Sequence, residues 1–122
     1  MITGTHAIIY SDDADATRAF FRDVLQFPYV DAQGGWLIFK APPAELGVHP
    51  VMEDSASSGH HEVYLMCDDI RATVDELRAK GVEFTSDVSD QGFGLVTTLA
   101  LPGGGELGLY EPRHPTAFDL DA

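Results

Sequence analysis

Basic residues, cysteines and long hydrophobic runs are all scarce in this chain, and each shortage excludes a class of protein. Only 7 Lys and Arg stand against 20 Asp and Glu, so the formal net charge is −13. Such a chain repels phosphate backbones and anionic lipids, so we expect no nucleic-acid or membrane partner. A cationic small molecule is electrostatically easier to bind, although acidity that serves solubility alone explains the charge equally well.

The single cysteine, Cys67, excludes an intrachain disulfide. No stretch approaches the ~20 apolar residues that span a bilayer, and the N-terminal MITGTHAIIY lacks the basic start and apolar core of a signal peptide. No Ser-His-Asp triad, phosphate-binding glycine loop or CxxC pair is recognisable. We therefore expect a cytoplasmic protein, and no residue is assigned a catalytic role.

The chain contains an internal repeat. HAIIYSDDADAT at 6–17 aligns without gaps on EVYLMCDDIRAT at 62–73, and Glu-Leu-Gly occurs at 45–47 and again at 106–108. With 122 residues there is room for one domain, residues 1–122, but not for two independent cores. The repeat therefore predicts two similar modules that build a single domain.

Each half predicts one helix among four strands. In the first, Asp12 or Asp13 caps a helix over 14–26; in the second, Asp68 or Asp69 caps a helix over 70–80 and Gly81 ends it. Strands are expected at 3–11, 29–33, 36–41, 45–49, 62–66, 82–88, 94–101 and 106–111. The fold class is α+β: two tandem βαβββ modules that form a curved, cup-like mixed sheet with helices on its outer face. The boundaries are about 2–50 for module one, 51–61 for a linker, 62–112 for module two and 113–122 for a tail.

This order of signals, with FFRDVLQF, ELRAKGVEF and LPGGGELGLYEPR, resembles the vicinal oxygen chelate superfamily of glyoxalase I, bleomycin-resistance proteins, fosfomycin-resistance enzymes and extradiol dioxygenases. The resemblance covers about residues 2–114. It implies that the modules enclose a ligand, often between two subunits, and that metal-using members bind a divalent ion through first-strand and last-strand side chains.

Two of the four positions at which the resemblance implies metal ligands carry glycine in this chain. The first-strand ligands fall on His6 and Glu62, whereas the last-strand ligands fall on Gly47 and Gly108. Because a divalent ion needs several convergent ligands, we favour no metal cofactor, and ring-cleaving dioxygenase chemistry is disfavoured. A divalent ion is the alternative, and its ligands would then be His6, Glu62, His49 and Glu106.

Strand alternation predicts the ligand-binding residues, since side chains two apart share a face of the sheet. The expected set is His6, Tyr10, Gly47, His49, Glu62, Tyr64, Met66, Gly108 and Tyr110. The two glycines are expected to leave room at the floor of the site. Glu45 and Glu106 share this face too, although exposed strand ends are the favoured interpretation for them. His60, His61 and His114 are expected at the surface.

Two functions fit this sequence. In the first, the protein binds a small organic molecule without a metal ion, as the resemblance to bleomycin-resistance proteins implies. The acidic net charge favours a cationic molecule. In the second, it is a metal-dependent lyase, isomerase or transferase, in which the ion acts as a Lewis acid and a spare carboxylate as general base. Either way, open sheet edges need covering, so we expect a homodimer, as the resemblance also implies.

Overall fold

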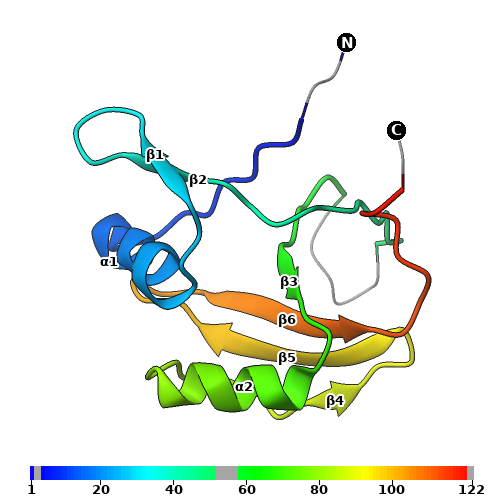
Figure 1. Cartoon of the computed structure of the whole chain (residues 1–122). Coiled ribbons are helices and arrows are strands. Elements are labelled where there is room, and N and C mark those ends of the chain that lie inside the picture. Colours follow the sequence, from blue (N-terminus) through cyan, green and yellow to red (C-terminus); the bar gives the residue numbers. More distant parts are fainter. Residues whose placement is uncertain (2–3, 52–57, 121–122) are drawn as a thin grey trace.

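The computed structural model describes residues 1, 4–51 and 58–120, and it is an α+β structure with two sheets (Figure 1). The elements of the first half are α1 (Ala14–Ala19), the π-helical turn η1 (Phe20–Val24), β1 (Tyr29–Asp31) and β2 (Leu37–Phe39). Those of the second half are β3 (Tyr64–Met66), α2 (Ile70–Ala79), β4 (Ser89–Asp90), β5 (Gly94–Ala100) and β6 (Glu106–Pro112). Residues 2–3 and most of the expected linker, residues 52–57, lie outside the described residues.

The second half forms a four-stranded sheet with α2 on one face (Figure 1). Its strand order is β3-β6-β5-β4, with β3 parallel to β6 and the other neighbours antiparallel. The chain order of this half, strand, helix and three strands, is the one the sequence predicts. The strand expected at 82–88 is wrong, because this segment pairs through the single bridge of Phe84 with Leu99 and β4 follows it at Ser89–Asp90. Both helix caps fall within the predicted pairs: Asp69 accepts from the Ala72 amide, and Asp13 accepts from the Ala16 amide.

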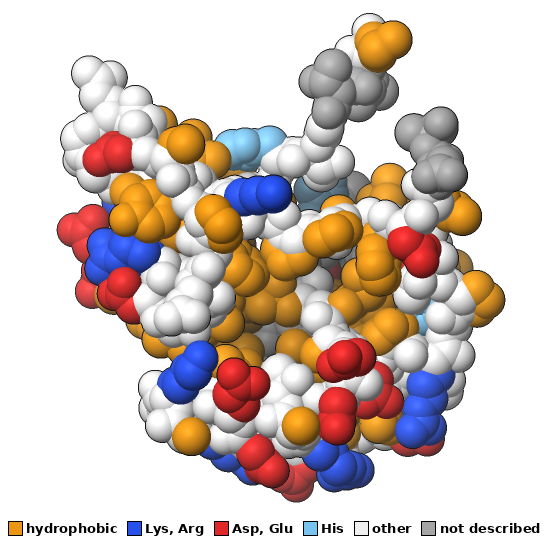
Figure 2. Space-filling view, in the orientation of Figure 1, with side chains coloured by type: hydrophobic (Ala, Val, Ile, Leu, Met, Phe, Trp, Pro, Cys, Tyr) orange, Lys and Arg blue, Asp and Glu red, His pale blue; other side chains and the backbone are white. Residues whose placement is uncertain are grey.

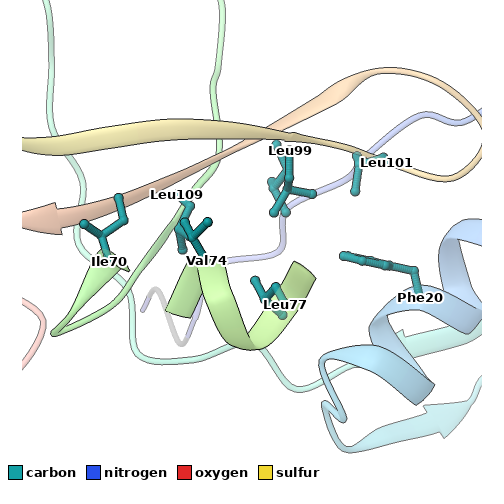
Figure 3. Packing of buried hydrophobic residues seen from close by; sticks show 8 residues of the cluster. Phe20, Ile70, Val74, Leu77, Leu99, Leu101 and Leu109 are labelled. Carbon is teal, nitrogen blue, oxygen red and sulfur yellow. The ribbon is translucent and has the colours of Figure 1, made fainter. Parts of the chain in front are cut away.

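The core lies between α2 and this sheet, as Figure 3 shows. Apolar residues at helical spacing form the face of α2 that points to the sheet. Odd-numbered residues of β5 and β6 pack against this face. The buried cluster consists of Phe20, Ile70, Val74, Leu77, Leu99, Leu101, Leu107 and Leu109. Since Phe20 is the first residue of η1, the first half shares this core. Even-numbered residues of β6 consequently point to the opposite face.

The first half differs from the prediction in its outer strands. The hairpin β1–β2 forms, but the chain over 4–10 and over 41–51 is extended without strand pairing in the described structure. The strands expected at 3–11 and 45–49 are therefore wrong as sheet strands in this structure. Alternating apolar residues fit a strand, but a strand also needs a partner edge, and these segments lie exposed.

The helix α1 is held on the turn between β5 and β6. The Asp12 amide donates to the Gly103 carbonyl at 3.1 Å, and the Thr17 hydroxyl donates to the Pro102 carbonyl. Gly103 has φ of +90°, and a Cβ there would lie 2.9 Å from the backbone N and O of Asp13. Only glycine fits both that backbone angle and that approach. The turn thus positions the first half of the chain against the second.

None of the described helices combines the length and the apolar character that crossing a bilayer requires.

Candidate functional site

Aromatic rings gather on the face of the four-stranded sheet that points away from α2. Edge-to-face packing joins Tyr110 to Tyr64, with ring centroids 5.8 Å apart, and to Phe93 at 6.0 Å. The His114 ring lies 6.1 Å from that of Tyr110. We call Tyr64, Phe93, Tyr110 and His114 the aromatic cluster. Because Tyr64 and Phe93 are 43% and 53% exposed, the cluster presents ring surface that a ligand can cover.

Gly108 is the reason that Tyr64 can lie flat on the sheet. The two residues are direct partners in the parallel pairing of β3 and β6. A Cβ at Gly108 would lie 2.9 Å from Tyr64 Cγ, and closer still to Cδ1. The room expected above this glycine is therefore filled by the Tyr64 ring. An acidic side chain at position 108 would exclude that ring.

The hydroxyl of each of the two tyrosines is hydrogen-bonded to a carboxylate. The Tyr64 hydroxyl donates to Glu62 at 3.2 Å, and the Tyr110 hydroxyl donates to Glu45 at 3.3 Å. Burial raises the pKa of both tyrosines, and the neighbouring carboxylate raises each pKa further. Both phenols consequently remain protonated donors at neutral pH.

The start of the C-terminal tail covers one end of the cluster. The Arg113 amide donates to the Phe93 carbonyl at 2.8 Å, which aligns the tail with the loop before β5. His114 Nε2 then lies 3.3 Å from the Tyr110 hydroxyl and 3.8 Å from Glu45 Oε1. The Ala117 amide donates to Glu45 Oε2 at 2.7 Å. In Figure 1 the tail runs beside the chain that follows β2.

Figure 2 shows hydrophobic side chains around a hollow between the chain that follows β2 and the four-stranded sheet. Two further hollows, of about 460 and 410 Å³, lie along α1 with η1 and along α2. Neither of these two is lined by a residue that the sequence predicts for the site. The aromatic cluster is therefore the place where predicted site residues meet.

The predicted site residues fall into two groups. Glu62, Tyr64, Gly108 and Tyr110 come together, and half-buried Met66 follows on β3. The remaining residues lie exposed on the unpaired segments of the first half: His6, Tyr10, Gly47 and His49. A Cβ at Gly47 would meet no atom within 4 Å. The structure thus assembles the half of the site that the second module supplies.

The alternative metal ligands do not assemble within the described chain. His6, His49, Glu62 and Glu106 are all described, yet no three His, Cys, Asp or Glu side chains in the described residues form a group that could hold an ion. The last-strand position that an acid would occupy is closed by Tyr64. Within the described residues of one chain, the donor set that the family resemblance implies is therefore not assembled.

Sequence reasoning missed Phe93, and it expected His114 at the surface without its contact with Tyr110, against which the ring is half-buried. The antiparallel register of β5 and β6 pairs Gly94 with Pro112, so extending it one residue places Phe93 opposite Arg113. That register follows from the short PGGGE turn and was the available signal for Phe93. The contact of Glu45 with Tyr110 joins residues 65 apart in sequence. No local sequence pattern predicts this contact.

Comparisons with known proteins agree with this fold. A family model described as Glyoxalase/Bleomycin resistance protein/Dioxygenase superfamily matches residues 5–112. No curated protein sequence matches the chain significantly. Three solved structures are similar to this chain. The first, a member of this superfamily from Sphaerobacter thermophilus DSM 20745, has 24% sequence identity and a TM-score of 0.63, and the match covers 90% of this chain and 98% of that chain.

Lactoylglutathione lyase from Agrobacterium tumefaciens has 20% identity and TM-score 0.60, over 89% of this chain and 92% of its own. TnmS3, an antibiotic binding protein from Streptomyces sp. CB03234, has 18% identity and TM-score 0.57, over 89% of this chain and 100% of its own. At these identities the structural likeness shows the fold alone. Because the family model spans most of the chain, the protein belongs to the glyoxalase/bleomycin resistance protein/dioxygenase superfamily, also called the vicinal oxygen chelate superfamily.

Proposed function

We propose that the protein binds a small organic molecule, preferably an aromatic cation, on the aromatic cluster without a metal ion. The observation that carries this proposal is the Tyr64 ring on Gly108, which places a ring where the family resemblance implies a last-strand metal ligand. Exposed tyrosine and phenylalanine faces bind flat apolar groups and cations. The cytoplasmic location expected from the sequence is part of the proposal.

The electrostatics of the site favour a cation. Glu45 and Glu62 lie at the two tyrosine hydroxyls, and the whole chain carries a formal charge of −13. The ring quadrupole and these carboxylates attract the same sign of charge. An anionic ligand of similar shape would be repelled by both.

The relatives support two different functions. TnmS3 is described as an antibiotic binding protein, and the Agrobacterium tumefaciens relative as a lactoylglutathione lyase. We favour binding because the side chains that a lyase of this family would use for a metal do not gather in the described residues. A metal-dependent lyase, isomerase or transferase remains the second candidate, supported by the fold that the lyase shares.

A dye titration tests the proposal. Acridine orange, a planar cation, should bind saturably with a rise in fluorescence anisotropy, and chelator-treated protein should bind it equally well. Tyr64→Ala and Phe93→Ala should each weaken binding by about threefold or more, since a ring–cation contact contributes about 0.5–2 kcal/mol. Anilinonaphthalene sulfonate, a planar anion, should bind far more weakly than acridine orange.

Tyr29→Ala is the matched control, because Tyr29 lies 48% exposed on the separate β1–β2 hairpin. Its dye affinity should equal that of the unmodified protein. Unchanged affinity in all three variants would show that acidity alone attracts the dye. Binding that requires added zinc, manganese, nickel or iron would instead support the metal-dependent candidate.

We further propose a two-fold homodimer that covers the unpaired segments. Tyr10, Leu46 and Val48 are 89%, 91% and 93% exposed and lie on chain without strand pairing. Extended backbone with free hydrogen-bonding groups and apolar side chains is a template for pairing with another chain. A second copy offers the same segments, so two-fold symmetry would close the assembly.

Light scattering at micromolar concentration should therefore give twice the mass of the 122-residue chain. The double variant Leu46→Glu with Val48→Glu should be monomeric, because two added charges per copy would be buried together at the interface. Val30→Glu, at a 65% exposed site on β1, should leave the dimer intact. A monomeric unmodified protein would refute this assembly.

A further inference from the structure

Glu45 is a mostly buried carboxylate for which the described structure provides no strong cationic partner. Its side chain is 15% exposed, yet neither Lys nor Arg among the described residues lies within ion-pair distance of it. The titratable ring of His114 lies 3.8 Å from it. Burying a carboxylate is costly unless hydrogen bonds or an opposite charge compensate for the lost water.

Two of the three groups that approach the Glu45 carboxylate belong to the tail, and the third, the Tyr110 hydroxyl, belongs to β6. The Ala117 amide and the Tyr110 hydroxyl each donate to one oxygen of Glu45, and His114 approaches the oxygen that Tyr110 uses. His114 Nδ1 meanwhile lies 2.8 Å from the Pro115 carbonyl, which can only accept, so Nδ1 carries a proton. When Nε2 is protonated as well, the ring faces Glu45 as a cation. Glu45 and Tyr110 are the charged or titratable groups recorded within contact of this ring.

The tail itself is weakly attached beyond these contacts. Arg113 is tied to the loop before β5 by its amide and by a 3.5 Å ion pair with Asp90, which is half exposed on both sides. Downstream, Phe118 and Leu120 remain 39% and 73% exposed. Since Glu45 lies on chain without strand pairing, its contacts with residues 114–117 hold the tail in place at this end.

From this geometry we propose that Glu45 is the cation-accepting, specificity-determining residue of the site, and that residues 114–117 form a strap which a cationic ligand displaces from it. The proposal rests on the binding function proposed above. The ligand class that it specifies is an aromatic compound with a protonated amine, because an ammonium or amidinium group can donate to Glu45 in place of the Ala117 amide and can take the position beside Glu45 that the His114 ring occupies. The ligand's ring would then stack on the part of Tyr110 that His114 now covers.

The strap costs binding energy, because the ligand must break its contacts before it reaches Glu45. Removing the strap should therefore tighten the binding of cations, whereas removing the Glu45 charge should weaken it. His114 would be an ordinary wall of the site if its loss weakened binding. A strap and a wall of the site therefore predict opposite changes in ligand affinity when the His114 side chain is removed.

The test titrates acridine orange into His114→Ala, Ala117→Pro, Glu45→Gln and the double variant Glu45→Gln with His114→Ala. The first two should bind the dye about threefold more tightly or better, since each loses one contact of the strap. Glu45→Gln should bind it at least about threefold less tightly, and adding His114→Ala to it should bring no gain. Tail variants that bind the dye less tightly, or exactly as the unmodified protein does, would overturn the proposal.

A second measurement separates this proposal from the binding function. Hydrogen exchange of the Ala117 amide should be slow in the unmodified protein, faster in Glu45→Ala, and faster when the dye is bound. If the unmodified protein binds no dye while the Ala117 amide is protected through Glu45, the binding function fails and the strap stands. If the dye binds without changing exchange at Ala117, the strap fails and the binding function stands.

Discussion

Gly103→Ala should lower the free energy of unfolding by about 2–4 kcal/mol, whereas Gly105→Ala should cost about 1–2 kcal/mol. Both glycines lie in the turn between β5 and β6 with nearly the same backbone angle, φ of +90° and +86°. Both substitutions therefore carry the same left-handed strain. Only at Gly103 would the new Cβ strike the backbone of Asp13 and the Ser11 hydroxyl; at Gly105 no atom lies within 4 Å.

The difference between the two variants measures how firmly α1 is held on the turn. Urea denaturation gives both free energies, and hydrogen exchange at the Asp12 amide, which donates to Gly103, reports the same contact locally. We expect Asp12 exchange to accelerate in Gly103→Ala and to stay unchanged in Gly105→Ala. Equal destabilisation by the two substitutions would mean that α1 does not depend on this close approach.

The elements that local sequence predicts are those whose stabilising contacts are local. Asp69 at the start of α2 and Gly81 after its end are hydrogen-bonding and backbone signals that act within one turn of the helix. The tight turn at 102–105 likewise determines which residues of β5 and β6 pair. These features are confirmed with small shifts of their boundaries.

The predictions of the outer strands of the first half were wrong because a sheet strand requires a partner edge as well as a suitable residue pattern. Leu46 and Val48 alternate with a small residue in the way that a half-buried strand does, and the run from Ala7 to Tyr10 is rich in residues that favour strands. Alternation states which face is apolar but not which edge will supply the hydrogen bonds. The homodimer proposed above is one source of such an edge.

The candidate site was predictable where it followed from pairing within the second half. Tyr64, Gly108 and Tyr110 share a face by simple alternation along β3 and β6, and the structure confirms that they meet. The occupant of the space above Gly108 was not predictable, because it depends on the register of two parallel strands that are separated in sequence by α2, β4 and β5. The Glu45 contacts were hidden for the same reason, since they join the chain after β2 to the distant end of β6 and the tail that follows it.

Gly108→Leu should weaken acridine orange binding by about tenfold or more, which corresponds to about 1.4 kcal/mol. A side chain at this position would occupy the volume of the Tyr64 ring and drive it off the sheet. Loss of the Tyr64 position also removes its packing against Tyr110 and its hydrogen bond to Glu62. The unliganded variant should lose about 1–3 kcal/mol of stability through overpacking.

Gly47→Leu is the matched control, because a Cβ at Gly47 meets open space and the residue is exposed. The sequence alone predicts the same loss for both glycines, whereas the structure predicts it for Gly108 only. A stability cycle completes the experiment: Gly108→Ala should be destabilising alone and nearly neutral in a Tyr64→Ala background, where the ring that it strikes is gone. If Gly108→Leu folds and still binds the dye normally, the ligand does not bind on the aromatic cluster, and the proposed function is wrong.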